Sequence, residues 1–303
     1  KSKNKEQFQL VFDKTPFYAE SGGQVGDTGF IVNANEKIYI TDTQKENNLI
    51  IHFCDKLPED LLAKFHAGIN HENRRMITNN HSATHLMHSA LKRVLGEHVN
   101  QKGSLVNAEH TRFDFSHFSK VTDEEIARIE KMVNDKIREN IQLDEQRNVP
   151  VQKALEMGAT ALFGEKYGET VRVITFDPTY SRELCGGTHV PSTGQIGLFK
   201  IVSEGAVAAG VRRIEAITAD KADAYFKQQE DKLKELNELL KNPKDLSDRI
   251  RQILEENVAL QENINQIISK KAQGIKNDLI SRVKEVNGIN VIVDKLDLPT
   301  ADS

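Results

Sequence analysis

The chain has 303 residues, of which 38% are hydrophobic and 28% charged, and its formal net charge is −4 at pH 7. No apolar run approaches the roughly 18 residues that a membrane-spanning helix needs, which excludes a membrane partner and predicts a cytoplasmic protein. Its two cysteines, Cys54 and Cys185, are too few for a disulfide framework and fit a compartment that keeps thiols reduced.

Hydrophobic periodicity and turn signals predict an α+β fold built from four successive regions. In chain order we expect a small antiparallel β-barrel, an α+β domain, an antiparallel helical hairpin or coiled coil, and the start of a further domain. Their expected bounds are 1–67, 68–219, 220–287 and 288–303. The chain opens with Lys1 rather than Met, so we expect a fragment of a longer protein.

The first region is predicted to be the β-barrel. Apolar residues suited to strands recur in segments 8–12, 38–40 and 49–53. Between them, segment 16–29 is rich in glycine but lacks the Gly-Lys-Ser/Thr of a phosphate-binding loop, and no helix pattern follows it as a dinucleotide-binding fingerprint requires. We therefore interpret its glycines as corners of the barrel.

The second region mixes helices with strands. A helix is expected over 123–141, capped by Thr122 or Asp123, and strands over 171–176, 196–202 and 212–218. An earlier helix carries His81 and His85, four positions apart and therefore on one face, where both can bind one metal ion. We place its N-cap at Asn79 or Asn80 and its end at Gly96. Its histidines point away from its apolar stripe, towards a cleft or solvent.

A second pair of donors follows about a hundred residues later, in the segment 185–189 (CGGTH). The Gly186-Gly187 pair predicts a tight turn that folds both donors onto one ion. One thiolate and three imidazoles suit Zn²⁺, one ion per chain. The predicted ligands are His81, His85, Cys185 and His189.

The third region is rich in Lys, Glu, Gln and Asn, and Pro243 divides it into two helices. The second helix carries a heptad seam that favours a helical hairpin or a coiled-coil homodimer, with Asn257 at a position where a polar residue fixes register. Gly288 is expected to end this helix, and 289–293 to begin a strand. The seam consists of Leu246, Ile250, Ile253, Asn257, Leu260, Ile264 and Ile267.

Four motifs in this order resemble the editing domain of alanyl-tRNA synthetase, which also exists as a freestanding editing protein and, in a related form, in threonyl-tRNA synthetase. They are 81–90 (HSATHLMHSA), 101–106 (QKGSLV), 112–115 (RFDF) and 185–189 (CGGTH). The resemblance implies a barrel before the editing core, a helical arm after it, and a C-terminal globular domain that is cut off here. It also implies that the four predicted ligands form an editing site.

That site would hydrolyse the ester of mischarged Ser-tRNA(Ala) and Gly-tRNA(Ala). The parent enzyme ligates alanine to tRNA(Ala), but nothing in the chain resembles an ATP-binding synthetase core. ATP and Mg²⁺ would therefore belong to the missing part. A pocket sized for alanine rejects near-isosteres only about 10²-fold, which explains why a second, hydrolytic pocket is needed.

The resemblance further implies that Thr84 reads the serine hydroxyl and that Gln101 positions substrate or water. The alternatives are an exposed helix residue bonded to a carbonyl for Thr84 and a surface turn for Gln101. The tRNA acceptor end is the expected partner, and residues 71–120 hold more Lys and Arg than Asp and Glu. Candidates for contacting it, with surface solubility as the alternative role, are Arg74, Arg75, Lys102 and Arg212.

The residues leave the chemistry open. Four protein ligands are typical of a structural zinc, whereas a catalytic zinc keeps a position for water. A catalytic zinc would require either that one of the four residues does not bind the ion or that the coordination number rises when substrate arrives. The ion could then activate a water molecule or only orient the substrate. Cys185 as a covalent nucleophile is a further alternative. At the level of the whole chain, the alternatives are a freestanding editing protein, a non-catalytic zinc-stabilised tRNA-binding module and a generic metallohydrolase.

Overall fold

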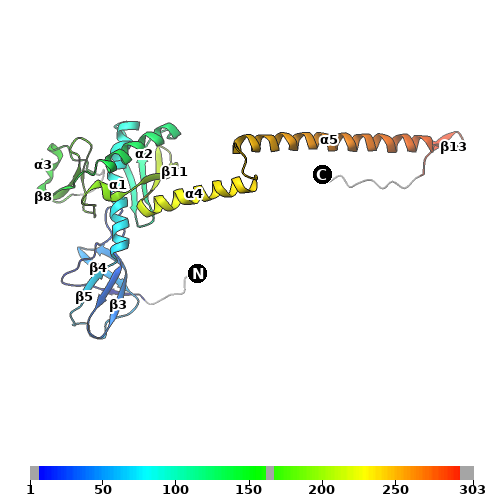
Figure 1. Cartoon of the computed structure of the whole chain (residues 1–303). Helices are drawn as coiled ribbons and strands as arrows, with labels where there is room; N and C mark the ends of the chain where they lie inside the picture. Colours follow the sequence, from blue (N-terminus) through cyan, green and yellow to red (C-terminus); the bar gives the residue numbers. More distant parts are fainter. Residues whose placement is uncertain (1–6, 162–166, 294–303) are drawn as a thin grey trace. The chain divides into compact units, whose positions relative to one another are not determined.

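The computed structural model describes residues 7–161 and 167–293, and the chain divides into two compact units, one up to Gln228 and one from Gln229 onward. Helices and antiparallel sheets alternate along the chain (Figure 1), which confirms the α+β class. None of the described helices is long and apolar enough to cross a membrane.

The first unit begins with a five-stranded antiparallel sheet in the order β1-β4-β3-β2-β5. Its strands are β1 (Phe8–Leu10), β2 (Gly29–Val32), β3 (Lys37–Glu46), β4 (Leu49–Cys54) and β5 (His66–Ile69). Alternating inward residues form its core; those on the buried face include Leu10, Ile31, Ile38, Ile40 and Cys54.

The prediction of a closed β-barrel is wrong, because β1 and β5 lie at opposite edges of this sheet and do not pair. The glycine-rich segment contacts this sheet, where the Glu20 amide donates to the Thr43 carbonyl at 2.9 Å. It also bonds to Val106: the Val106 amide donates to the Gly23 carbonyl at 2.7 Å, and the Val25 amide donates to the Val106 carbonyl at 3.0 Å. The segment therefore joins the sheet to the part of the unit that follows.

That part holds a four-stranded sheet, β11-β12-β7-β6, and a three-stranded sheet, β10-β9-β8, both antiparallel. The strands are β6 (Gln101–Val106), β7 (Thr111–Ser116), β8 (Asp144–Pro150), β9 (Thr170–Phe176), β10 (Ser181–Leu184), β11 (Phe199–Ala208) and β12 (Val211–Thr218). The helices are α1 (His71–Leu95), α2 (Asp123–Arg138) and α3 (Val151–Glu156), with a 3₁₀ turn at Thr193–Ile196.

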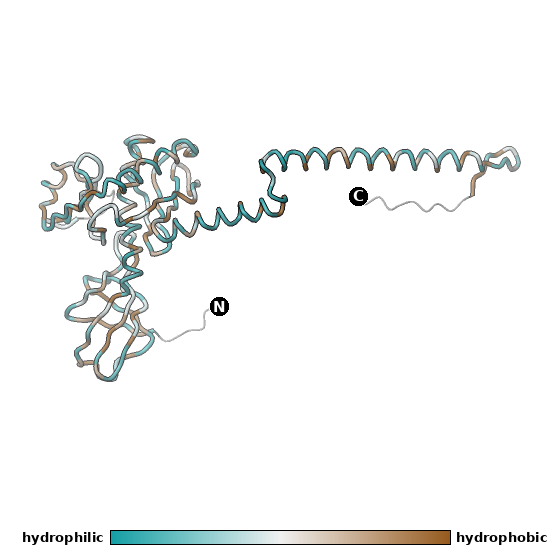
Figure 2. The backbone as a smooth tube through the Cα atoms, in the orientation of Figure 1, coloured by the Kyte–Doolittle hydropathy of each residue, from teal (hydrophilic) through white to brown (hydrophobic). Residues whose placement is uncertain are grey.

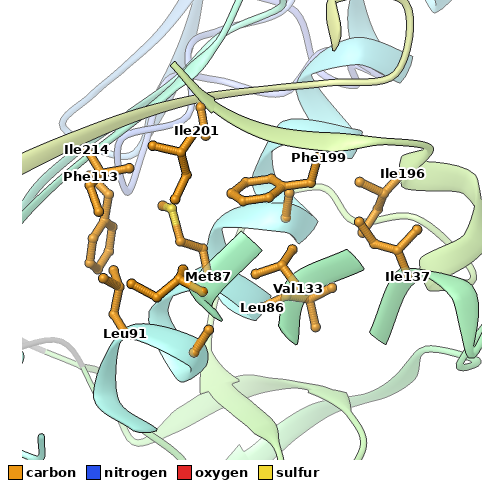
Figure 3. Close-up of a cluster of buried hydrophobic side chains, with 14 of the residues drawn as sticks. Leu86, Met87, Leu91, Phe113, Val133, Ile137, Ile196, Phe199, Ile201 and Ile214 are labelled. Atoms are coloured by element: carbon orange, nitrogen blue, oxygen red, sulfur yellow. The ribbon is translucent and has the colours of Figure 1, made fainter. Parts of the chain in front are cut away.

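The main core lies between α1, α2 and the four-stranded sheet (Figure 3). In this cluster Leu91 of α1 lies beside Phe113 of β7, and Leu86 of α1 lies beside Val133 of α2. The apolar stripe predicted for the histidine helix is thus buried, and it fixes the rotation of α1 about its axis. The histidines on the other side of the helix are positioned by this packing.

The helix α1 begins earlier than expected. Its N-cap is Asn70, whose Oδ1 accepts from the Asn73 amide at 3.1 Å, and not Asn79 or Asn80. Those two lie inside the helix and are buried; the Asn80 amide group bonds to the Asn107 carbonyl at 2.8 Å. Asn80, a residue type that suits a cap, serves here as a buried hydrogen-bond partner instead. The predicted end at Gly96 is confirmed.

The other predicted caps and breaks agree with the structure in part. Thr122 caps α2 through a capping box, as predicted, although α2 ends at Arg138 rather than at residue 141. Pro243 lies between α4 (Ala219–Leu239) and α5 (Leu246–Ser281). The second helix ends before Gly288, which instead lies between β13 (Lys284–Val286) and β14 (Ile289–Val291) of a small hairpin.

The predicted helical hairpin or coiled coil stays a prediction for α5. No residue of α5 is buried, and Ile253, Leu260 and Ile264 of its seam are all exposed. Figure 2 shows that hydrophobic residues recur at intervals along this otherwise hydrophilic helix. A narrow apolar stripe gains free energy only against a second stripe. Within the described residues, no such stripe covers it.

Candidate metal centre

The four predicted ligands come together in the first unit. Helix α1 places His81 and His85 one turn apart, 5% and 4% exposed, with ring centroids 5.2 Å apart. The loop that leaves β10 brings Cys185 and His189 against them. One donor atom from each of the four residues lies within 4.8 Å of the others.

The cysteine sulfur lies between two imidazole nitrogens. Cys185 Sγ is 3.4 Å from His81 Nε2 and 3.3 Å from His189 Nε2. Donors bound at 2.0–2.3 Å to a tetrahedral ion lie about 3.5 Å from one another. These two separations therefore match a shared zinc ion.

The protonation of His81 supports the same conclusion. Its Nδ1 lies 2.7 Å from Gln24 Oε1, which also accepts from the Thr188 amide at 2.9 Å and is thereby identified as the oxygen. The Nδ1–H must donate, so the neutral ring keeps a lone pair on Nε2, directed at the sulfur. His85 Nδ1 is buried without a hydrogen-bond partner in the described part of the chain. A metal ion is a suitable partner for this buried nitrogen, because the donor atoms of His81, Cys185 and His189 lie close by.

Burial also keeps the imidazoles in the form that binds metal. It lowers the pKa of His81 to about 3, with a smaller contribution from the neighbouring His85. Burial likewise lowers the pKa of His85 and, more strongly, that of His189. All three rings are therefore neutral at pH 7, as metal ligation requires.

The loop 185–189 is shaped by one glycine and one arginine. A Cβ on Gly187 would lie 2.1 Å from His81 Cε1, whereas a Cβ on Gly186 would meet nothing within 4 Å. Arg172 of β9 donates from Nη1 to the Cys185 carbonyl at 3.2 Å and also to the Gly187 carbonyl. The loop thus approaches α1 closely while its carbonyls turn towards Arg172.

Two buried residues beside the ligands, Glu183 and His88, were not among the predicted site residues. Glu183 Oε2 lies 3.8 Å from His85 Nε2, and Glu183 Oε1 lies 3.2 Å from His88 Nδ1. Burial opposes the ionisation of Glu183, but the two imidazoles outweigh it and lower its pKa. The carboxylate is therefore hydrogen-bonded to the His88 ring and lies next to the His85 ring.

The cluster opens onto a pocket of about 420 Å³, a volume suited to a small ligand. Three of the four predicted ligands line it, together with residues of the N-terminal sheet and its glycine-rich loop. Polar residues on its wall include Tyr18, Ser21, Lys45, Thr84, Gln101, Arg172 and Glu183.

Thr84 and Gln101 both lie on the pocket wall. Thr84 is buried, and its hydroxyl donates to the Asn80 carbonyl at 2.7 Å and lies 2.6 Å from Thr111 Oγ1. Thr84 therefore bonds to a helix carbonyl, as the alternative role predicted, and also lies on the pocket wall. Gln101 begins β6 and is partly exposed, not on a surface turn.

The predicted tRNA-contact residues lie in separate places, and three of them are ion-paired. Arg74 Nε donates to the buried Asp27 at 2.7 Å. Arg75 pairs with Asp220 at 2.7 Å, and Arg212 donates through two nitrogens to Glu204 at 2.6 Å. Lys102 is exposed on β6.

Two family models match separate parts of the chain. Residues 171–215 match the family described as "Threonyl and Alanyl tRNA synthetase second additional domain". Residues 1–71 match "tRNA synthetases class II (A)", in the region that the resemblance to alanyl-tRNA synthetase placed before the editing core. The first match contains the Cys185–His189 loop.

Relatives extend this likeness to the entire chain. The alanine–tRNA ligase of Cytophaga hutchinsonii is 57% identical over 303 residues, which are 100% of this chain and 34% of the relative. Those of Flavobacterium psychrophilum and Bacteroides fragilis are 51% and 52% identical over 96% and 99% of the chain, again 34% of each relative. The chain thus spans about a third of the length of these relatives, and over that third it belongs to the alanine–tRNA ligase family.

Proposed function

We propose that the chain is the editing portion of an alanine–tRNA ligase, and that it hydrolyses the ester of mischarged Ser-tRNA(Ala) and Gly-tRNA(Ala) at a zinc site. The observation that carries this proposal is the opening of the ligand cluster onto a pocket: His81, His85 and Cys185 line it beside Thr84 and Gln101. A zinc ion that only stabilised the fold would need no such opening.

Zinc bound by the four residues would polarise an ester carbonyl or acidify a water molecule. The chain's own groups would bind and orient the substrate. Gln101 offers an amide donor and acceptor on the wall, suited to positioning the ester or the attacking water. Glu183 would keep the His88 ring fixed beside His85 during the reaction.

Selection for serine would rest on Thr84. Its hydroxyl hydrogen goes to the Asn80 carbonyl, and one lone pair serves Thr111. One lone pair remains, and it would accept the hydroxyl of serine, which alanine lacks. A pocket with a buried hydrogen-bond acceptor rejects an amino acid that lacks the hydroxyl. This rejection is far stronger than the rejection by size in an apolar pocket.

The partner would be the acceptor end of tRNA(Ala), and Lys102 and Arg75 are the predicted cations that remain exposed enough to meet phosphates. The whole ligase would join alanine to that tRNA with ATP and Mg²⁺. We assign both to parts of the ligase outside this third of its length.

The test compares deacylation of Ser-tRNA(Ala) and Ala-tRNA(Ala) by protein of measured zinc content. We expect fast loss of serine and slow loss of alanine. Cys185→Ala should abolish serine release while the protein stays folded, whereas Cys54→Ala, a change of the same kind in the N-terminal sheet, should retain it. Intact Ser-tRNA(Ala) with one zinc per chain would refute the hydrolase proposal.

A second candidate function is a non-catalytic, zinc-stabilised tRNA-binding module. It is favoured by the presence of four protein donors, enough to fill a tetrahedral ion. This function predicts that chelation unfolds the first unit, and that zinc-loaded protein binds tRNA(Ala) without releasing either amino acid.

A further inference from the structure

The glycine-rich segment of the N-terminal sheet reaches the metal centre through one side chain, that of Gln24. Gln24 is 0% exposed, and it lies 57 residues before His81 and 164 residues before Thr188. The backbone N–H of Gln24 donates a hydrogen bond to the Ser21 carbonyl at 3.0 Å. The backbone that carries this side chain is therefore anchored to the turn at Ser21.

The Gln24 amide touches both halves of the ligand set. Its oxygen accepts from His81 Nδ1 at 2.7 Å and from the Thr188 amide at 2.9 Å, which uses both lone pairs. Its nitrogen donates to Thr188 Oγ1 at 3.0 Å. Thr188 directly precedes His189, so one amide group spans the ligand of α1 and the ligand loop.

We propose that Gln24 is a positioning residue of the metal centre, which fixes the tautomer of His81 and holds the Cys185–His189 loop at its distance from α1. The assignment rests on the zinc site of the proposed function. An acceptor at Nδ1 leaves the Nε2 lone pair for the ion and makes it a better donor. The N-terminal sheet thereby becomes part of the metal centre, although it supplies no ligand.

A purely packing role for Gln24 would give different results from a positioning role. Gln24→Met keeps the length and volume of the side chain but removes the acceptor. Gln24→Glu keeps an oxygen that accepts from His81 and from the Thr188 amide, and Thr188 Oγ1 can turn to donate to it. Gln9→Met, on an exposed position of β1, is the matched control.

The experiment measures zinc affinity by competition with a chromophoric chelator, and the visible spectrum of the Co²⁺-substituted protein. Loss of an outer-sphere partner of this kind weakens metal binding about 10–100-fold. We expect that loss in Gln24→Met, with weakened tetrahedral Co²⁺ bands, and affinity within about fivefold of wild type in Gln24→Glu and Gln9→Met. Circular dichroism of the metal-free proteins checks that all three fold.

Equal zinc affinity in Gln24→Met and wild type would overturn the assignment, and so would a wild-type protein that binds no zinc. An equal loss in Gln24→Met and Gln24→Glu would also overturn it, because packing alone would then explain both. Deacylation is measured separately. A wild-type protein that binds zinc but leaves Ser-tRNA(Ala) intact would refute the proposed function, while the affinity ratio still decides the role of Gln24.

Discussion

The two glycines between Cys185 and His189 provide the sharpest test at the scale of single residues. A methyl group on Gly187 would overlap the His81 ring, at 2.1 Å from Cε1, while one on Gly186 enters open space. We expect Gly187→Ala to lose most of its zinc affinity and Gly186→Ala to bind zinc as wild type does. Chelator competition on both variants measures this. Equal affinities would show that the loop can retreat from α1.

Thr84 tests the proposed selection of serine. Thr84→Val keeps the branched shape and removes the hydroxyl, so serine loses its acceptor and Thr111 loses a partner. We expect deacylation of Ser-tRNA(Ala) to fall about 10–100-fold, in line with the free energy of a lost buried hydrogen bond, and that of Gly-tRNA(Ala) to change much less. Thr84→Ser is the control that restores the hydroxyl. An equal loss on both esters would assign Thr84 to general shaping of the pocket.

Local spacing explains which site residues the sequence can predict. His81 and His85 are adjacent on any helix, and the sequence CGGTH carries its own turn, so the four donors were predictable as a set. Gln24 and Glu183 were missed, because their contacts with His81, His85 and His88 join segments 57 to 98 residues apart. Only the packing of α1 and the path of the glycine-rich segment bring these groups together.

At the scale of elements, Arg74 joins the start of α1 to the N-terminal sheet. Its guanidinium pairs with Asp27, whose side chain is 2% exposed, and Asp27 also accepts from the Tyr18 amide at 2.6 Å. Removing the cation leaves a buried charge uncompensated, so we expect Arg74→Met to lower the free energy of unfolding by about 3 kcal/mol.

The neighbouring Arg75 is the matched control, because its ion pair with Asp220 is about half exposed on both sides. Arg75→Met should cost less than about 1 kcal/mol. Urea unfolding of both variants measures the difference. If Arg74→Met instead weakened tRNA(Ala) binding at unchanged stability, the original prediction of an RNA contact would be the better one.

The same element shows why boundaries were harder to predict than types. The sequence around Asn79 and Asn80 carries good capping residues, and α1 runs through them. Inside the helix, the Asn80 side chain bonds to the Asn107 carbonyl and accepts from the Thr218 hydroxyl. The strands β1, β3 and β4 were predictable from their apolar residues, whereas the sequence analysis did not predict β2 and β5 as strands. Closure of the sheet depended on pairing between its edges, which no local pattern determines.

At the scale of the whole molecule, the uncovered seam of α5 predicts self-association. Ile253, Leu260 and Ile264 are exposed at heptad spacing, and Asn257 gives the register. We expect sedimentation to show a concentration-dependent dimer, and Ile264→Asp to return monomers with unchanged zinc affinity. Lys270→Asp, on an exposed residue outside the seam, should still dimerise. A monomer at all concentrations would contradict the prediction.

The two compact units should also differ in how they unfold. The first unit holds the large buried cluster around α1 and the candidate zinc centre, so its melting should be cooperative and sensitive to chelation. Ligand binding at a thousand times Kd stabilises a fold by about 4.1 kcal/mol. Helix α5 has no buried residue, and an isolated helix relies on propensity alone, so it should melt broadly and ignore chelators. Scanning calorimetry with and without a chelator, followed in parallel by circular dichroism, separates the two transitions. A chelator that shifted both transitions together would show that α5 and the first unit unfold as one body, and that the metal centre stabilises more of the chain than the residues around it.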